Sequence, residues 1–192
     1  MNKGERTKNY IIEQSSSLFN TIGYKATSIS DIMSATGLKK GGIYNHFESK
    51  EAIARASLQH LINTLKCKYK EEISLSSTAH GKLNAFFATF STLATDQIVI
   101  GGCPLMNAAI EADDTNFEFD GEVKDGFNGL SGFVQKILEF GIDSGEINKK
   151  VNPEQMSIFI LASLEGGLAL SRLYKEKKYL DTVIMQLNSQ LF

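Results

Sequence analysis

The stretch Thr27–Phe47, TSISDIMSATGLKKGGIYNHF, decides the fold, because it predicts two short helices joined by a tight turn. Ser28 is a favoured N-cap residue, and Asp31, three positions later, can bond back to the backbone N–H of the cap in a capping box. Apolar residues follow at helical spacing, so one face of the first helix is expected to be buried. Gly37 is placed to end that helix, since glycine adopts the left-handed conformation found at helix ends.

The second helix of this stretch has an outer face that suits duplex DNA. Ile43 and Phe47 are one turn apart and face inward. The residues on or near the outer face are Lys39, Lys40, Gly41, Gly42, Tyr44, Asn45 and His46. Lysines neutralise phosphates, glycines let backbone N–H groups approach an anion closely, and an asparagine can read a base edge. The pattern indicates a helix-turn-helix with its second helix in the major groove; a helical hairpin with incidental lysines is the alternative.

The pattern continues through the surrounding residues 6–51. It comprises Arg6, Ile11, Leu18, Phe19, Gly23, Tyr24, Thr27, Ser28, Ile29, Asp31, Ile32, Gly37, Lys40, Gly41, Gly42, Ile43, Tyr44, His46, Phe47, Lys50 and Glu51. In order and spacing, this segment resembles the DNA-binding domain of TetR/AcrR-type transcriptional regulators. With that resemblance, we expect Thr27, Ser28 and Lys50 to contact DNA together with the outer face.

Composition places the chain among helical globular proteins. Of its 192 residues, 42% are hydrophobic and 22% are charged, and only two are prolines. We predict an all-α fold of about nine helices. Besides the two in the helix-turn-helix, these cover residues 5–23, 48–73, 82–95, 105–112, 121–144, 153–176 and 180–192. No apolar run reaches the roughly 18 residues that cross a bilayer, and the polar N-terminus is no signal peptide, so we expect a cytoplasmic protein without a membrane partner.

Charge divides the chain into a basic beginning and an acidic remainder. Residues 1–50 carry seven Lys/Arg and four Asp/Glu, a net charge of +3, and the whole chain carries −2, which leaves −5 for the rest. Such an asymmetry is expected when only one part of a protein meets nucleic acid. We therefore predict a helix-turn-helix DNA-binding domain over residues 1–50 and a ligand-binding and dimerisation domain over residues 51–192.

The resemblance implies that helices in the middle of the chain enclose a pocket for a small effector. The candidate lining residues are Phe86, Phe87, Phe90, Cys103, Met106, Phe127, Leu130 and Val134. Effector pockets are mostly apolar, yet the same residues would also serve as plain core. Cys103 precedes a helix start, where a thiolate could be stabilised for redox sensing; a structural cysteine at a bend is the other interpretation. Cys67 is interpreted as a packing residue.

The last two helices are the candidate dimer interface. Helix 153–176 is apolar almost all round, and the resemblance assigns it and helix 180–192 to a four-helix contact between two copies. The residues expected there are Phe159, Ile160, Ser163, Gly166, Gly167, Leu170 and Leu187. A two-fold dimer would double the number of base pairs that are read on a palindrome. The alternative is a central core helix of a monomer.

Signs of catalysis or metal binding are missing from the sequence. His46, His60 and His80 have no metal-ligand spacing with each other or with the two cysteines. Since no nucleotide-binding or nucleophile motif occurs either, we expect no enzyme, no metal and no cofactor. The function predicted is a repressor that binds palindromic operator DNA as a homodimer and releases it when a small apolar or amphipathic effector binds. The alternative is a small-molecule-binding or adaptor protein without operator recognition.

Overall fold

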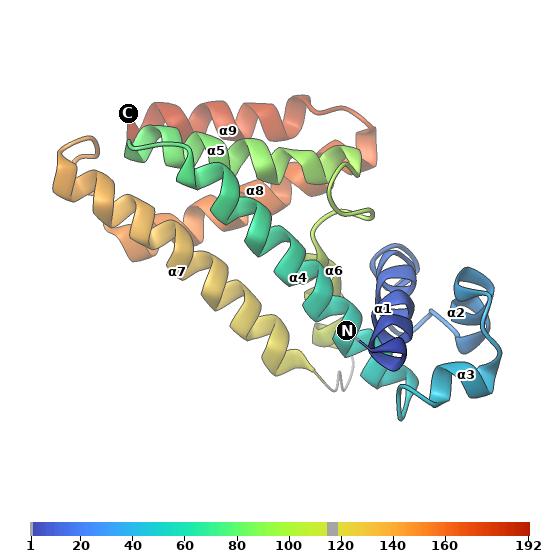
Figure 1. Cartoon of the computed structure of the whole chain (residues 1–192). Helices are drawn as coiled ribbons and strands as arrows, with labels where there is room; N and C mark the ends of the chain where they lie inside the picture. The colour runs from blue at the N-terminus through green and yellow to red at the C-terminus, as the bar shows by residue number, and fades with distance from the viewer. Residues whose placement is uncertain (1, 115–118) are drawn as a thin grey trace. The chain divides into compact units, whose positions relative to one another are not determined.

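The computed structural model of the chain describes residues 2–114 and 119–192, and this described part is built from α-helices without strands (Figure 1). The helices are α1 (Lys3–Ile22), α2 (Ile29–Thr36), α3 (Lys40–Tyr44), α4 (Lys50–Ser74), α5 (Ala79–Ser91), the 3₁₀ helix η1 (Thr92–Thr95), α6 (Pro104–Asp114), α7 (Asp120–Ser144), α8 (Pro153–Tyr174) and α9 (Lys178–Leu191). The predicted all-α fold is confirmed.

The chain forms two compact units. The head unit comprises residues 1–64 and 99–123, and the body unit comprises residues 65–98 and 124–192. These units do not coincide with the boundary that we predicted at residue 50, because the first part of α4 and the whole of α6 group with the N-terminal helices. Helices α4 and α7 each contribute residues to both units.

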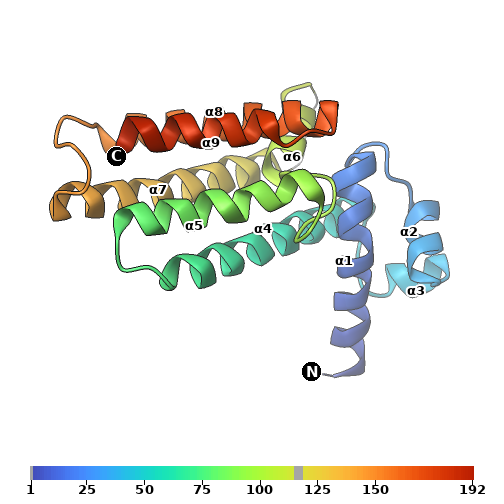
Figure 2. The same ribbon diagram turned by 90° about the horizontal axis from the view of Figure 1, so that it is seen from above.

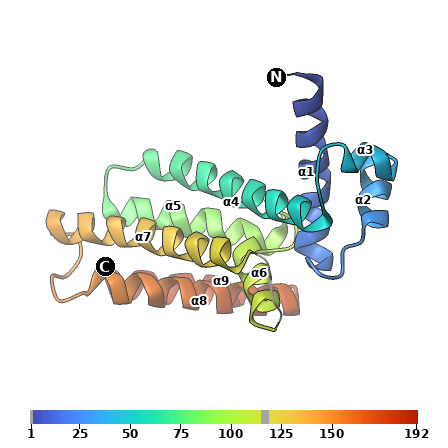
Figure 3. The same cartoon turned by 90° about the horizontal axis from the view of Figure 1, so that it is seen from below.

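In the head unit, α2 packs against both α1 and α3 (Figures 2 and 3). Helix α1 begins with a capping box between Asn2 and Glu5, and it ends at Gly23, whose φ of 107° is open to glycine but strained for other residues. Ile11, Phe19, Ile32, Ile43 and Ile53 are fully buried and form the core on which the helices meet.

In the body unit, α8 packs against α9 (Figure 2). Gly167 allows this close packing, because a Cβ atom at this position would lie 3.1 Å from Val183 Cγ2 and 3.2 Å from the Leu180 Cα. Helix α5 starts at Ala79, three residues earlier than predicted, because the Thr78 hydroxyl accepts the N–H of Gly81 and caps it.

Helix α8 is the one helix of the described residues that, by length and composition alone, could cross a membrane. Core helices of globular proteins pass the same test, and 44% of its most apolar window is buried inside the structure. Its apolar character is therefore weak evidence for a membrane span.

Candidate nucleic-acid interface

The start of α2 is held by the predicted capping box. The amide and hydroxyl of Ser28 donate to Asp31 Oδ2 at 2.8 and 2.7 Å, and the amide of Asp31 donates to Ser28 Oγ at 3.2 Å. The hydrogen bonds from the Ser28 hydroxyl and amide hold the pKa of Asp31 below its ordinary value. At the other end Gly37 is left-handed, with φ 69°, and its amide donates to the Met33 carbonyl at 2.9 Å. Both ends of α2 are thus fixed as the sequence predicted.

Helix α3 is shorter than we expected and presents an exposed basic face. It ends at Tyr44, so Asn45 and His46 lie just beyond it, where the amide of Asn45 donates to the Gly41 carbonyl at 3.0 Å. Lys39, Lys40, Gly41, Tyr44 and Asn45 are exposed, and Gly42 and His46 are half-buried. The Lys40 ammonium lies 5.8 Å from the centre of the Tyr44 ring. The structure therefore brings together all seven residues that were predicted on this face.

The two glycines of α3 face open space. Nothing in the described part of the chain lies within 4 Å of the position that a Cβ atom would take at Gly41. At Gly42 the nearest atom would be the Leu38 Cβ, at an ordinary contact distance of 3.9 Å. The fold itself therefore does not require glycine at either position. The bare backbone instead leaves room for something that approaches α3 from outside.

Lys50 and Thr27 were predicted to contact DNA, but both side chains bond the protein's own backbone. Lys50 Nζ donates to the backbone carbonyls of Tyr24, Lys25 and Thr27 at 3.1, 3.0 and 3.0 Å. An ammonium group has three N–H donors, so these bonds engage all of them. Thr27 is fully buried, and its hydroxyl donates to the Gly23 carbonyl at 2.6 Å. For both residues the geometry favours holding the loop between α1 and α2 over touching a phosphate.

A carboxylate that sequence reasoning missed holds the same loop through its N–H groups. Glu111, on α6, accepts the amides of Tyr24 and Lys25 through Oε1 and Oε2 at 2.7 and 2.9 Å. Its partners lie 86 or more positions away along the chain. No short-range pattern could have found it, because motif spacing describes only neighbours in sequence.

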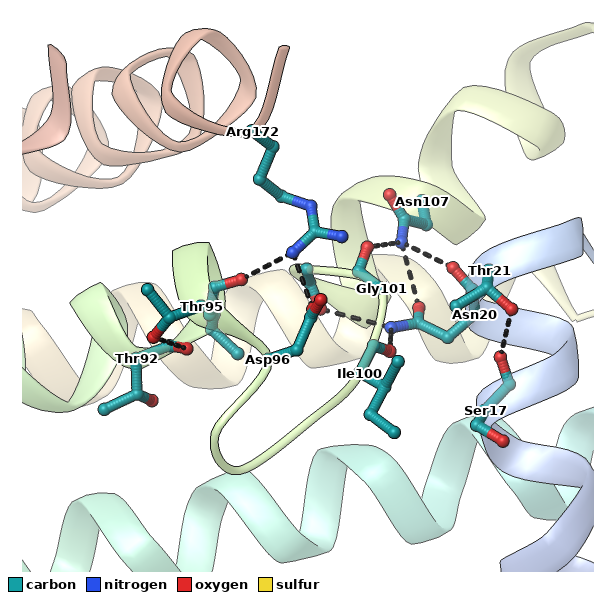
Figure 4. Close-up of polar contacts among 12 residues, drawn as sticks. Ser17, Asn20, Thr21, Thr92, Thr95, Asp96, Ile100, Gly101, Asn107 and Arg172 are labelled. Atoms are coloured by element: carbon teal, nitrogen blue, oxygen red, sulfur yellow. Dashed lines mark hydrogen bonds and ion pairs between the residues drawn. The ribbon is translucent and has the colours of Figure 1, made fainter. Parts of the chain in front are cut away.

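Asparagines fasten α6 to the end of α1 (Figure 4). The Asn107 side-chain amide donates to the carbonyl and the side-chain oxygen of Asn20 at 3.1 and 3.0 Å, and to the Gly101 carbonyl at 2.9 Å. Asn20 in turn donates to the carbonyls of Ile100 and Gly102. A Cβ atom at Gly101 would lie only 2.6 Å from the Asn20 carbonyl oxygen. The chain before α6 is therefore locked against α1.

Tyr24 packs inside this part of the head unit. Its ring stacks on Phe19, with centroids 5.6 Å apart, and meets the edge of Phe119 at the same separation. Burial, the Glu111 carboxylate and Cys103 raise the pKa of the Tyr24 phenol. Cys103 itself is buried in the head unit, while Cys67 is exposed on α4, contrary to the packing role that we expected.

The predicted effector-binding residues are divided between the two units. Cys103 and Met106 belong to the head unit, whereas Phe86, Phe87, Phe90, Phe127, Leu130 and Val134 belong to the body unit. Phe86, Phe87, Phe90 and Val134 are fully buried, and Phe127 and Leu130 are half-buried. The ring of Phe86 lies within 4.8–6.4 Å of the rings of Tyr69, Phe87 and Phe90. These aromatic side chains form the core of the body unit in this structure.

The predicted dimer residues separate into two faces of α8 and α9. Ile160, Gly167 and Leu187 are buried between helices of the same chain, which corrects their assignment to an outer surface. Phe159, Gly166 and Leu170 are exposed and Ser163 is half-buried, so these keep an outward position. An open groove is formed by residues of α8 and α9, and the buried Gly167 contributes to it. Its lining residues are Ala162, Ser163, Gly166, Gly167, Leu170, Lys178, Tyr179, Thr182 and Val183.

Comparison with known proteins agrees with this geometry. Residues 11–57 match the family model described as "Bacterial regulatory proteins, tetR family", and residues 79–187 match "Tetracyclin repressor-like, C-terminal domain". The HTH-type transcriptional repressor DhaR of Mycobacterium sp. (strain GP1) is 25% identical over 175 residues, covering 91% of this chain and 86% of DhaR.

Solved structures show the same fold over nearly the whole chain. A TetR transcriptional regulator from Chloroflexus aurantiacus J-10-FL has a TM-score of 0.92 and 34% identity, covering 98% of this chain and 96% of that one. CifR, solved as a cysteine mutant in complex with 26 bp operator DNA, shares the fold with a TM-score of 0.82 at 15% identity, covering 96% of each chain. The relatives named here are regulators of transcription. The chain belongs to the TetR family and is a DNA-binding transcriptional regulator.

Proposed function

We propose that the protein is a cytoplasmic, homodimeric repressor that binds a palindromic operator and releases it when a small apolar or amphipathic effector binds. The observation that carries the proposal is the exposed face of α3, where Lys39, Lys40 and Asn45 surround a backbone left bare at Gly41. A duplex that enters this space meets positive charge and an amide that can read a base edge.

Each residue of the face has a proposed role. Lys39 and Lys40 neutralise phosphates, and Tyr44 and His46 donate to phosphate oxygens. Asn45 reads a base, while Gly41 and Gly42 allow the backbone of α3 to approach the groove floor. Ser28 is exposed at the start of α2 and keeps its amide and hydroxyl on Asp31, so its proposed role is to cap the helix N-terminus whose following N–H groups meet a phosphate.

Dimer formation is supported by the exposed apolar side of the last two helices. Phe159, Leu170 and Leu173 on α8 are 47%, 44% and 70% exposed, and Met185 on α9 is 59% exposed. Apolar groups this exposed along one helix pair favour association with a second copy. A dimer would place two α3 helices on successive major grooves, about 34–36 Å apart.

An effector releases the operator only if it binds the non-binding conformation more tightly than the operator-binding one. The aromatic core around Phe86 makes an apolar effector the chemical class that the body unit suits. A ligand that binds the native state also raises the melting temperature, so a thermal-shift screen of hydrophobic compounds identifies candidates.

Operator binding is tested by gel shift with DNA from upstream of the protein's own gene. We expect a specific complex for the native chain and a change of base preference for Asn45→Ala. The matched control is Asn148→Ala, since Asn148 is an exposed asparagine of the body unit. If Asn45→Ala loses the same affinity on every DNA sequence, a base-reading role for Asn45 is rejected. If the native chain forms no specific complex at all, the result favours an adaptor protein.

A further inference from the structure

The loop between α1 and α2 is held from both sides by groups of opposite charge. Its backbone N–H groups at Tyr24 and Lys25 donate to Glu111, while its carbonyls accept from Lys50. Hydrogen bonds with an ionised partner are roughly twice as strong as neutral ones. Two side chains outside the five-residue loop Gly23–Thr27 therefore hold it, together with the bonds that Thr27 makes to Gly23 within it.

We call the bonds of the α1–α2 loop to Glu111 and to Lys50 the clamp. Helix α6 holds Glu111 in a fixed position within it. Asn107 and Glu111 are four residues apart, so both lie on one face of α6. Asn107 bonds the end of α1, and Glu111 bonds the loop that follows it (Figure 4 shows the Asn107 part). Gly23 makes room for the carboxylate, because a Cβ atom there would lie 2.9 Å from Glu111 Oε1.

The clamped loop leads directly into the DNA-facing helices. It is followed directly by Ser28, which caps α2, and α2 is joined to α3 by only three residues, 37–39. A change in the loop therefore changes where α2 begins and how α3 is presented. We propose that Glu111 is a positioning residue that holds the α1–α2 loop in its DNA-binding conformation, so that α6 controls operator affinity without touching DNA. This inference rests on the proposed operator binding.

The path of the chain links this clamp to the body unit. Residues 99–123 belong to the head unit, but the chain continues into the body unit at both of their ends. An event in the body unit that draws this segment away removes the acceptor for two loop amides. By linkage, a bound operator must strengthen the clamp by the same factor as the clamp strengthens operator binding.

The decisive experiment compares Glu111→Gln with Asp113→Asn, measured by fluorescence anisotropy on operator and on shuffled DNA. Asp113 is exposed two residues further along α6, so its variant makes the same change of charge. Removing a negative charge should by itself favour DNA binding. We nevertheless expect Glu111→Gln to bind operator on the order of tenfold more weakly, the equivalent of one lost charge-assisted bond, with little change on shuffled DNA.

Amide hydrogen exchange supplies a second, local readout. In Glu111→Gln, the amides of Tyr24 and Lys25 should exchange faster, while those of the buried half of α1 keep their protection. Should Glu111→Gln fold poorly, Asn107→Ala tests the same row of bonds and should weaken operator binding in the same direction.

The outcomes separate this inference from the function on which it rests. If Glu111→Gln binds operator as tightly as Asp113→Asn, the positioning role is wrong although the proposed operator binding stands. If the native chain itself shows no preference for operator over shuffled DNA, the proposed function fails first.

Discussion

The guanidinium of Arg172, on α8, lies 2.6 Å from Asp96 Oδ1, and the same Nη1 donates to the Leu93 carbonyl at 2.9 Å (Figure 4). Asp96 adopts the left-handed conformation that ends η1, with φ 55°. Arg172 thus ties the turn after η1 to a helix of the same unit.

Replacing Arg172 should destabilise the body unit. Since both side chains are partly exposed, we expect Arg172→Ala to lower the free energy of unfolding by about 1 kcal/mol. Arg172→Lys keeps the charge but loses the planar fork, so it should recover only part of this stability. Denaturant unfolding measures both. Equal stability of the native chain and Arg172→Ala would contradict a structural role for the pair.

Replacing Lys50 should separate a positioning role from a phosphate contact. Because its ammonium bonds the backbone of the α1–α2 loop, Lys50→Met should lower the free energy of unfolding by roughly 1–3 kcal/mol. The dependence of operator affinity on salt should stay unchanged. A phosphate contact would instead reduce the slope of log K against log salt by about 1, so titrations at several salt concentrations decide.

Acid should weaken the start of α2 through Asp31. Its pKa is lowered in the folded protein by the Ser28 hydrogen bonds, so its contribution is present above the unfolded pKa and is lost as the pH falls through the folded value. The melting temperature of Asp31→Asn should therefore fall less steeply than that of the native chain as the pH drops below about 4, the ordinary pKa of an aspartate. Parallel declines in both proteins would mean that other carboxylates dominate.

Substituting Gly41 should move stability and DNA binding in opposite directions. An alanine meets nothing in the described part of the chain, so Gly41→Ala should raise the free energy of unfolding by about 0.4–1 kcal/mol. The added methyl group would occupy the space that we assign to the duplex, so operator affinity should fall. Gly129→Ala, on α7 and equally open, is the control that should gain stability alone. A variant of Gly41 that binds operator normally would show that DNA does not approach there.

The parts of this structure that sequence predicted well depend on neighbours along the chain. The capping box at Ser28 and the left-handed Gly37 follow from spacings of a few residues, and both are present. The role of Lys50 could not be read in this way. A lysine near a helix start suits a phosphate and a backbone carbonyl equally, and only the folded loop shows which acceptors it meets.

The predictions that changed depend on which face of a helix meets another helix. Ile160 and Phe159 are adjacent and both apolar, yet one is fully buried and the other is 47% exposed. On a helix that is apolar almost all round, periodicity cannot tell an inner face from an outer one. Glu111 shows the same limit for polar residues, because nothing near it in sequence marks its partners.

The double attachment of the α1–α2 loop bears on how this regulator could be re-engineered. A chimera that transplants only the first 50 or 64 residues onto another sensor would bring Lys50 along but leave Glu111 behind. The backbone amides of Tyr24 and Lys25, in the loop before α2, would then lose their acceptor. If Glu111 positions the loop as we propose, transferring specificity requires grafting α6 as well, or supplying a carboxylate at the equivalent place in the recipient.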